Sequence, residues 1–167
     1  MDCEDVKKIN VFIILFIHLH RFVIKKNMLE GLKHAHSGFR WILLLFLVGV
    51  IVNSILKWKR NESFKIKDGA LSTITLIITH SMVLLGLVLY FMGKKFDIEN
   101  SNVFYAIVHP LGMILAATFI TIGHSKAKKS KTSRSKFRKI FVWFLAGLII
   151  IMISIPWPFI YASASWA

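Results

Sequence analysis

The sequence predicts an all-α integral membrane protein, an antiparallel four-helix bundle. Of its 167 residues, 56% are hydrophobic, and its mean hydropathy of +0.63 is well above that of a typical water-soluble domain. The charged side chains also gather between long apolar runs instead of being spread evenly. We expect helices because lipid offers the backbone no hydrogen-bond partner.

Four apolar runs are long enough to cross a bilayer, which takes about 20 residues at about 1.5 Å each. The expected spans are residues 38–57, 70–92, 103–124 and 139–160. Aromatic side chains near their ends are typical interface anchors: Trp41, Trp58, Tyr90, Tyr105, Trp143 and Trp157. We assign residues 28–160 to this transmembrane domain and residues 161–167 to a short outer tail.

The first 27 residues do not continue this pattern. The run VFIILFIHLHRFVI at 11–24 is short and is interrupted by His18, His20 and Arg21. Acidic side chains precede it, and no small-residue cleavage site follows, so it makes a poor signal peptide. We expect either that translation begins at Met28 or that residues 1–27 form an interfacial helix.

Basic residues in the connections predict the orientation. Residues 57–67 contain five Lys and Arg and residues 126–139 contain eight, whereas the second connection has only Lys94 and Lys95, offset by two carboxylates. The positive-inside rule therefore places loops 58–69 and 125–138 in the cytoplasm. The expected location is the inner (cytoplasmic) membrane, as a multi-pass protein.

The basic run KAKKSKTSRSKFRK at 126–139 and the net charge of +14 also resemble a nucleic-acid patch. A basic run beside a transmembrane helix is usually a topology signal and an anchor for anionic lipid. No zinc-finger or RNA-binding signature accompanies it. We expect the lipid bilayer as partner and no nucleic acid.

Five histidines lie in or near the predicted spans: His34, His36, His80, His109 and His124. No Asp or Glu lies within those spans, which disfavours an ion pump or transporter. Imidazole is a usual axial ligand of haem held between helices. The histidines therefore indicate haem b. The alternative is that they only form hydrogen bonds between helices.

Two ligand schemes follow from the expected depths. His80 with His109 is the closest match. A small shift of the third helix would instead pair His36 with His109 and His80 with His124, which would hold two haems. Arg40, one helical turn from His36, is placed to bind a propionate.

The expected haem slot contains small residues. Gly86 is expected to make room near His80. Gly112, Met113, Ala116 and Ala117 follow His109 on its face of the helix. Such glycines and alanines are also common where helices simply pack together in membranes. The single cysteine, Cys3, predicts neither a disulfide nor a cysteine metal site.

The segments KHAHSGFRWILLL, ITHSMVLLGLVLYF, VHPLGMILAATFITIGHSKAKK and IPWPF resemble a family of small four-helix membrane proteins of Bacteroidota, commonly labelled "cytochrome B". The resemblance covers about residues 29–160. It implies haem b and electron transport. The motif positions that it carries over are His36, Arg40, His80, His109 and His124.

The expected function is that of a b-type cytochrome, alone or in an oligomer, passing electrons to or from a quinone or a respiratory-chain protein. No motif of an independent enzyme is present: the chain lacks a Ser/His/Asp set and a nucleotide-binding loop. The main alternative is a cofactor-free structural or assembly subunit. A transporter of a metal ion or small solute is the third hypothesis.

The charge pattern generates a topology prediction. Single cysteines placed in residues 60–67 or 126–138 should be labelled only from the cytoplasmic side, because Lys and Arg hold these loops there. Cysteines placed in residues 96–101 serve as the matched control and should react from outside intact cells. Labelling of loop 126–138 from outside would contradict the assignment.

Overall fold

The computed structural model describes residues 3–94, 104–155 and 157, and, within these ranges, side chains from Asn27 onward except at 93, 94 and 105. All its regular elements are helical: α1 (Cys3–Lys59), α2 (Ile66–Lys94), the π-helical turn η1 (Phe104–Val108), α3 (His109–Lys128) and α4 (Ser133–Ser154). The expected all-α four-helix fold is confirmed. Loop 95–103 and the tail 161–167 lie outside the described residues.

Four helical segments have the length and apolar composition of membrane spans: Asn27–Lys59, Ile66–Met92, Ala106–Lys128 and Ser133–Ser154. The outward faces of the bundle are apolar as well, with Leu45 and Ile153 each 72% exposed. A water-soluble bundle would place polar side chains there. These helices indicate a multi-pass membrane protein.

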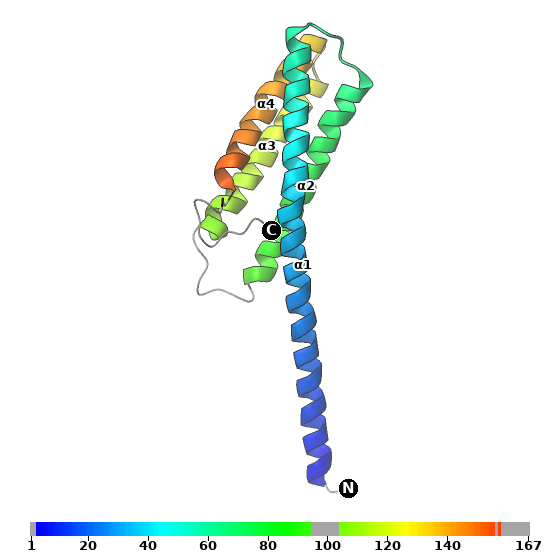
Figure 1. Ribbon diagram of the computed structural model, residues 1–167, viewed down its shortest axis with the longest axis vertical. Coiled ribbons are helices and arrows are strands. Elements are labelled where there is room, and N and C mark those ends of the chain that lie inside the picture. The colour runs from blue at the N-terminus through cyan, green and yellow to red at the C-terminus, as the bar shows by residue number, and fades with distance from the viewer. Residues whose placement is uncertain (1–2, 95–103, 156, 158–167) are drawn as a thin grey trace.

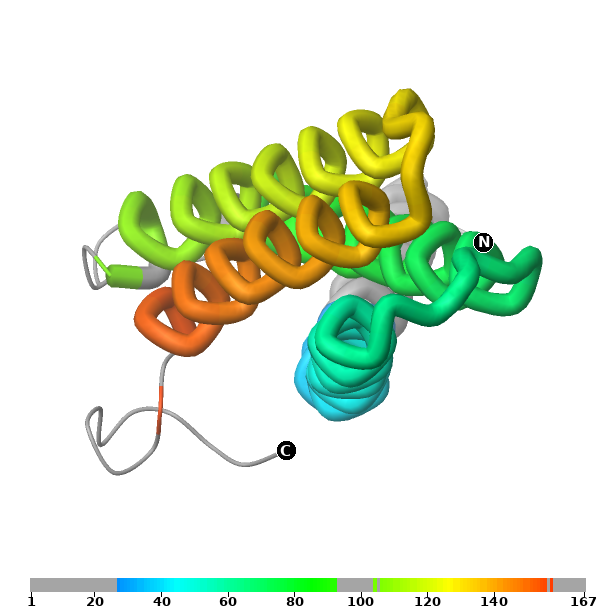
Figure 2. The backbone as a smooth tube through the Cα atoms, turned by 90° about the horizontal axis from the view of Figure 1, so that it is seen from above, coloured from blue at the N-terminus to red at the C-terminus, as the bar shows by residue number. Residues whose placement is uncertain are grey.

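The helices form a closed ring in chain order. α1 packs against α2 and α4, and α3 packs against α2 and α4. The interface between α3 and α4 is the most extensive, and Figure 2 shows these two helices side by side. The two basic connections, α1–α2 and α3–α4, meet at one end of the bundle (Figure 1).

Contacts between the α1–α2 connection and the first turns of α4 hold that end together. The Phe64 N–H donates to Ser133 Oγ at 2.9 Å, and the Phe64 and Phe137 rings lie 5.0 Å apart. The Lys136 ammonium sits 5.1 Å from the centre of the Phe64 ring. The loops that sequence analysis assigned to one side of the membrane therefore share one end of the fold.

Helix α1 is longer than the expected first span. It runs without a break from Cys3 to Lys59 and extends well beyond the other three helices (Figure 1). The expected boundary at residues 27 and 28 is therefore not a helix boundary. Gly31 and Gly38 do not interrupt the helix, because single glycines cost only about 1 kcal/mol each.

Helix α4 begins and ends earlier than expected. The Thr132 side chain accepts a hydrogen bond from the Ser135 N–H at 3.3 Å, which caps the helix at its first turn. Ile155 has an extended backbone, with φ −77° and ψ 132°. This follows from Pro156, since a proline disfavours helical geometry in the residue before it.

The interior of the bundle is a set of four buried stripes, one per helix, in which residues are spaced alternately three and four apart. This spacing is typical of helices packed in bundles. The stripes contain Leu43, Leu47, Val50 and Ser54 on α1; Asp68, Ser72, Thr75, Thr79 and Met82 on α2; Ala116, Ile120, Gly123 and Ala127 on α3; and Phe137, Ile140, Phe144, Gly147, Ile151 and Ser154 on α4.

Glycines allow α3 and α4 to approach closely. A Cβ on Gly112 would collide with the Ser154 side chain, and one on Gly123 would collide with Trp143 Cβ. A Cβ on Gly147 would come within 2.8 Å of Ile120. Gly112 and Ala116 therefore act in helix packing, the alternative that the sequence leaves open for them.

The packing predicts a contrast between two glycines. Gly123→Ala should lower the free energy of unfolding by about 2 kcal/mol, because its Cβ meets the rigid first carbon of Trp143. Gly49→Ala is the control, since a Cβ there meets nothing within 4 Å, and it should be neutral or slightly stabilising. Unfolding in detergent, followed by circular dichroism, measures both. Equal effects would contradict the packing.

Candidate functional site

Two histidines meet at the end of the bundle opposite the basic loops. The ring centres of His36 on α1 and His109 at the start of α3 are 6.2 Å apart, with the ring planes at 86°. α2 contributes Gly86 beneath the His36 ring, and α4 contributes the Ser154 carbonyl. All four helices therefore converge on this histidine pair.

A backbone carbonyl determines the tautomer of His109. His109 Nδ1 lies 2.7 Å from the Ser154 oxygen, and a carbonyl can only accept. Nδ1 therefore carries the hydrogen and donates it, which leaves Nε2 of the neutral ring with a lone pair. Histidines that bind metals are commonly held in this way, with one ring nitrogen on a backbone carbonyl and the other on the metal.

His36 carries a polar atom without a hydrogen bond. Its Nδ1 is buried and finds no partner among the described residues. Leaving such a group unsatisfied costs about 1–3 kcal/mol, and most buried polar side-chain atoms in folded proteins have a partner. This atom therefore points to a ligand or a proton donor supplied from outside the chain.

Gly86 allows the His36 ring to lie directly against α2. A Cβ at this position would be 3.2 Å from His36 Cε1, which is tighter than an ordinary contact. The sequence predicts that Gly86 makes room for His80. The structure corrects this, because Gly86 continues the buried stripe of α2 while His80 faces away from that stripe.

Arg40 follows His36 by one turn on α1 and is partly buried. Its guanidinium carbon lies 5.2 Å from the centre of the Trp41 ring, a distance typical of a cation–π contact. Arg40 therefore brings a permanent positive charge to the histidine pair. His34, by contrast, is exposed.

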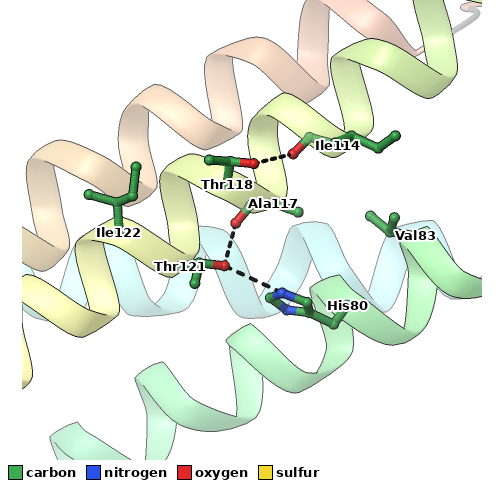
Figure 3. A pocket seen from close by; sticks show the side chains of 7 residues that line it. All are labelled: His80, Val83, Ile114, Ala117, Thr118, Thr121 and Ile122. Carbon is green, nitrogen blue, oxygen red and sulfur yellow. Dashed lines mark hydrogen bonds between the residues drawn. The ribbon is translucent and has the colours of Figure 1, made fainter.

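His80 lies in an open groove between α2 and α3 (Figure 3). Its Nδ1 donates to the Leu76 carbonyl at 2.9 Å, and its Nε2 lies 3.4 Å from the Thr121 hydroxyl. That hydroxyl is also 2.7 Å from the Ala117 carbonyl, and its single hydrogen can serve only one acceptor well. The second His80 contact is therefore weak.

The position of His80 corrects the expectation that it projects into the bundle. Thr79 is buried, whereas His80 is exposed on the bundle surface. Successive residues of an α-helix are rotated by about 100°, so only one of these neighbours can face inward. In a membrane the His80 groove faces lipid.

His124 lies nearer the basic loops. Its Nδ1 is 3.3 Å from the Ser72 hydroxyl, and Ser72 is buried on α2. This contact joins α2 to α3. It agrees with the alternative prediction, in which the histidines form hydrogen bonds between helices. His124 also lines a pocket with Lys128 and Lys136.

The structure brings together His36 and His109 but not the other expected pairs. His80 is level with Thr121, and His109 precedes Thr121 by twelve residues, about 18 Å along α3. The expected closeness of His80 and His109 is therefore wrong. His124 is level with Ser72, which is two turns from His80 along α2.

Asp68 is a charged residue that sequence analysis placed just outside the second span. It lies in the first turn of α2, is 4% exposed, and its Oδ1 accepts from Lys57 Nζ at 2.6 Å and from Asn53 Nδ2 at 3.0 Å. Its Oδ2 accepts from the Lys65 N–H at 3.0 Å. The carboxylate is therefore fully occupied in joining α1 to α2.

No group of three or more His, Cys, Asp or Glu side chains suited to a metal ion occurs in the described part of the chain. Comparisons of the chain with protein-family models, with curated proteins and with solved structures find no match.

The Asp68 contacts predict a stability difference. Asp68→Ala should lower the free energy of unfolding by about 2 kcal/mol, because Lys57 and Asn53 would lose a buried partner. Glu62→Ala is the matched control, since Glu62 pairs with Arg60 at 3.8 Å on the surface, and should cost less than about 1 kcal/mol. Denaturant unfolding in detergent measures both. A larger effect of Glu62→Ala would contradict this assignment.

Proposed function

We propose that this chain is a membrane b-type cytochrome in which His36 and His109 would hold haem b. Its role is electron transfer to or from a quinone or a partner protein in the inner (cytoplasmic) membrane. Loops 58–69 and 125–138 face the cytoplasm in this proposal. The single observation that carries it is the 6.2 Å separation of the two imidazole rings.

That separation suits two nitrogens bound to one metal. A metal held between two imidazoles separates the ring centres by roughly 6 Å, since metal–nitrogen bonds to histidine are about 2 Å long. The unpartnered His36 Nδ1 also supports a ligand at this place.

The chain's own residues have separate tasks in this proposal. The Ser154 carbonyl orients His109 and keeps the hydrogen on Nδ1. Arg40 offers a cation to a propionate. When bound, haem supplies the one-electron chemistry, and the protein supplies ligation, orientation and an apolar environment.

The geometry favours one haem over two. A second haem would need His80 and His124 together, but His80 faces outward from the bundle. These two histidines also lie at different depths. We therefore assign them to contacts between and within helices.

The same contacts support a second candidate function, a cofactor-free structural or assembly subunit. In that case His80 and His124 would link α2 to α3, and the His36–His109 ring contact would link α1 to α3. The buried His36 Nδ1 favours the cytochrome, because a purely structural role leaves that atom without a partner.

A transporter of a metal ion or small solute is the third candidate. Pathways for ions through membranes usually contain carboxylates. The described carboxylate nearest the bundle interior, Asp68, is already bonded to Lys57 and Asn53. This use of Asp68 favours the cytochrome over the transporter.

Haem spectra of purified variants test the proposal. Protein from haem-replete cells should show a reduced-minus-oxidised b-type spectrum, and His36→Ala and His109→Ala should each remove most of it because each deletes one ligand. His80→Ala should retain it. If His80→Ala instead loses half of the haem signal, a second haem is present.

His34→Ala is the control, because His34 is exposed on α1 only two residues from His36. Its spectrum should match that of the unchanged protein, and circular dichroism should show equal helical content throughout. A colourless protein with full helical content, purified from haem-replete membranes, would overturn the cytochrome proposal. The cofactor-free subunit would then be the better account.

A further inference from the structure

A second site candidate lies at the opposite end of the bundle, between the two basic loops. This pocket of about 230 Å³ is lined by Phe64 from the first loop, Ser72 and Thr73 from α2, His124 and Lys128 from α3, and Lys136 from α4. It therefore collects two cations and several hydrogen-bonding side chains from four separate segments.

The positive charge at this end is largely uncompensated. Residues 57–68 and 126–139 contain thirteen Lys and Arg but only two carboxylates, Glu62 and Asp68. Glu62 lies 3.8 Å from Arg60, and Asp68 is held by Lys57 at 2.6 Å. Among the described residues, no carboxylate is within ion-pair distance of Lys128 or Lys136.

The pocket has one polar and one apolar wall. Lys136 Nζ is 5.1 Å from the centre of the Phe64 ring, so these two lining side chains are in contact. Lys128 is exposed one turn beyond His124. Ala127 and Ile140 are buried and form the apolar floor. A ligand with a negative head and an apolar body suits both walls.

We propose that this pocket binds the phosphate group of an anionic phospholipid. It lies where the spans end, at the level of the lipid headgroups, and basic pockets between transmembrane helices are known to take such headgroups. Lys128 and Lys136 bind the phosphate oxygens, and Phe64 and Ile140 contact the glycerol and the first acyl carbons. This site is independent of haem.

Native mass spectrometry of the full chain in neutral detergent tests the proposal. Phosphatidylglycerol should be retained in preference to phosphatidylcholine of the same chain length. The double variant Lys128→Gln/Lys136→Gln should weaken phosphatidylglycerol binding about thirtyfold, because each of the two lysines near a lipid phosphate contributes about 1 kcal/mol. The variant Lys128→Arg/Lys136→Arg should restore it.

Lys131→Gln/Arg134→Gln is the matched control, since it removes the same charge from exposed positions outside the pocket, and it should bind within about twofold of the unchanged protein. Thr73→Glu, at the exposed rim, offers a second variant that leaves both lysines in place and should also weaken binding. Equal losses in the two double variants, or equal retention of both lipids, would overturn the proposal.

Inorganic phosphate distinguishes binding of a lipid phosphate group from binding of free phosphate. At millimolar concentration it should displace phosphatidylglycerol only weakly, because the apolar wall contributes to lipid binding. Complete displacement, with loss of the preference between lipids, would mean that the pocket takes free phosphate and would overturn the assignment to lipid.

Discussion

Polar side chains within the spans must lie away from lipid, and this requirement sets how each helix is rotated about its axis. Lipid cannot hydrogen-bond to side chains or backbone, so each polar group in a span needs a partner inside the protein. On α2 the buried Thr75 and Thr79 hydroxyls donate to backbone carbonyls one turn back, at 2.8 Å and 2.7 Å. The polar stripe of α2 therefore faces the mainly apolar stripes of the other three helices, and further apolar side chains cover the outside of the bundle.

The same stripes build both ends of the molecule. Towards one end they bring together His36, Gly86, His109 and the Ser154 carbonyl. Towards the other they bring Asp68 against Lys57 and Asn53. The close contact of α3 with α4 sets the height of Ser154 relative to His109. The packing of α3 against α4 therefore also orients His109, the candidate ligand.

Part of the candidate site could have been predicted from spacing alone. His36 and Arg40 extend the buried α1 series of Leu43, Leu47 and Val50 by the same alternation of three and four residues. His109 extends the α3 series in the same way. His80 and His124 each follow a buried position by one residue, Thr79 and Gly123, and are therefore turned by about 100°. The depth of a residue below the aromatic belt does not show to which side of the helix its side chain points.

The all-α class, the four apolar helices and the pairing of the two basic loops at one end follow from the sequence, because hydropathy and charge act over whole segments. The contact of His36 with His109, the outward position of His80 and the burial of Asp68 follow only from how the helices pack. These outcomes depend on the rotation and axial shift of each helix. Both are set by side-chain contacts between distant segments, such as Gly123 against Trp143, and a backbone carbonyl such as that of Ser154 has no sequence signature.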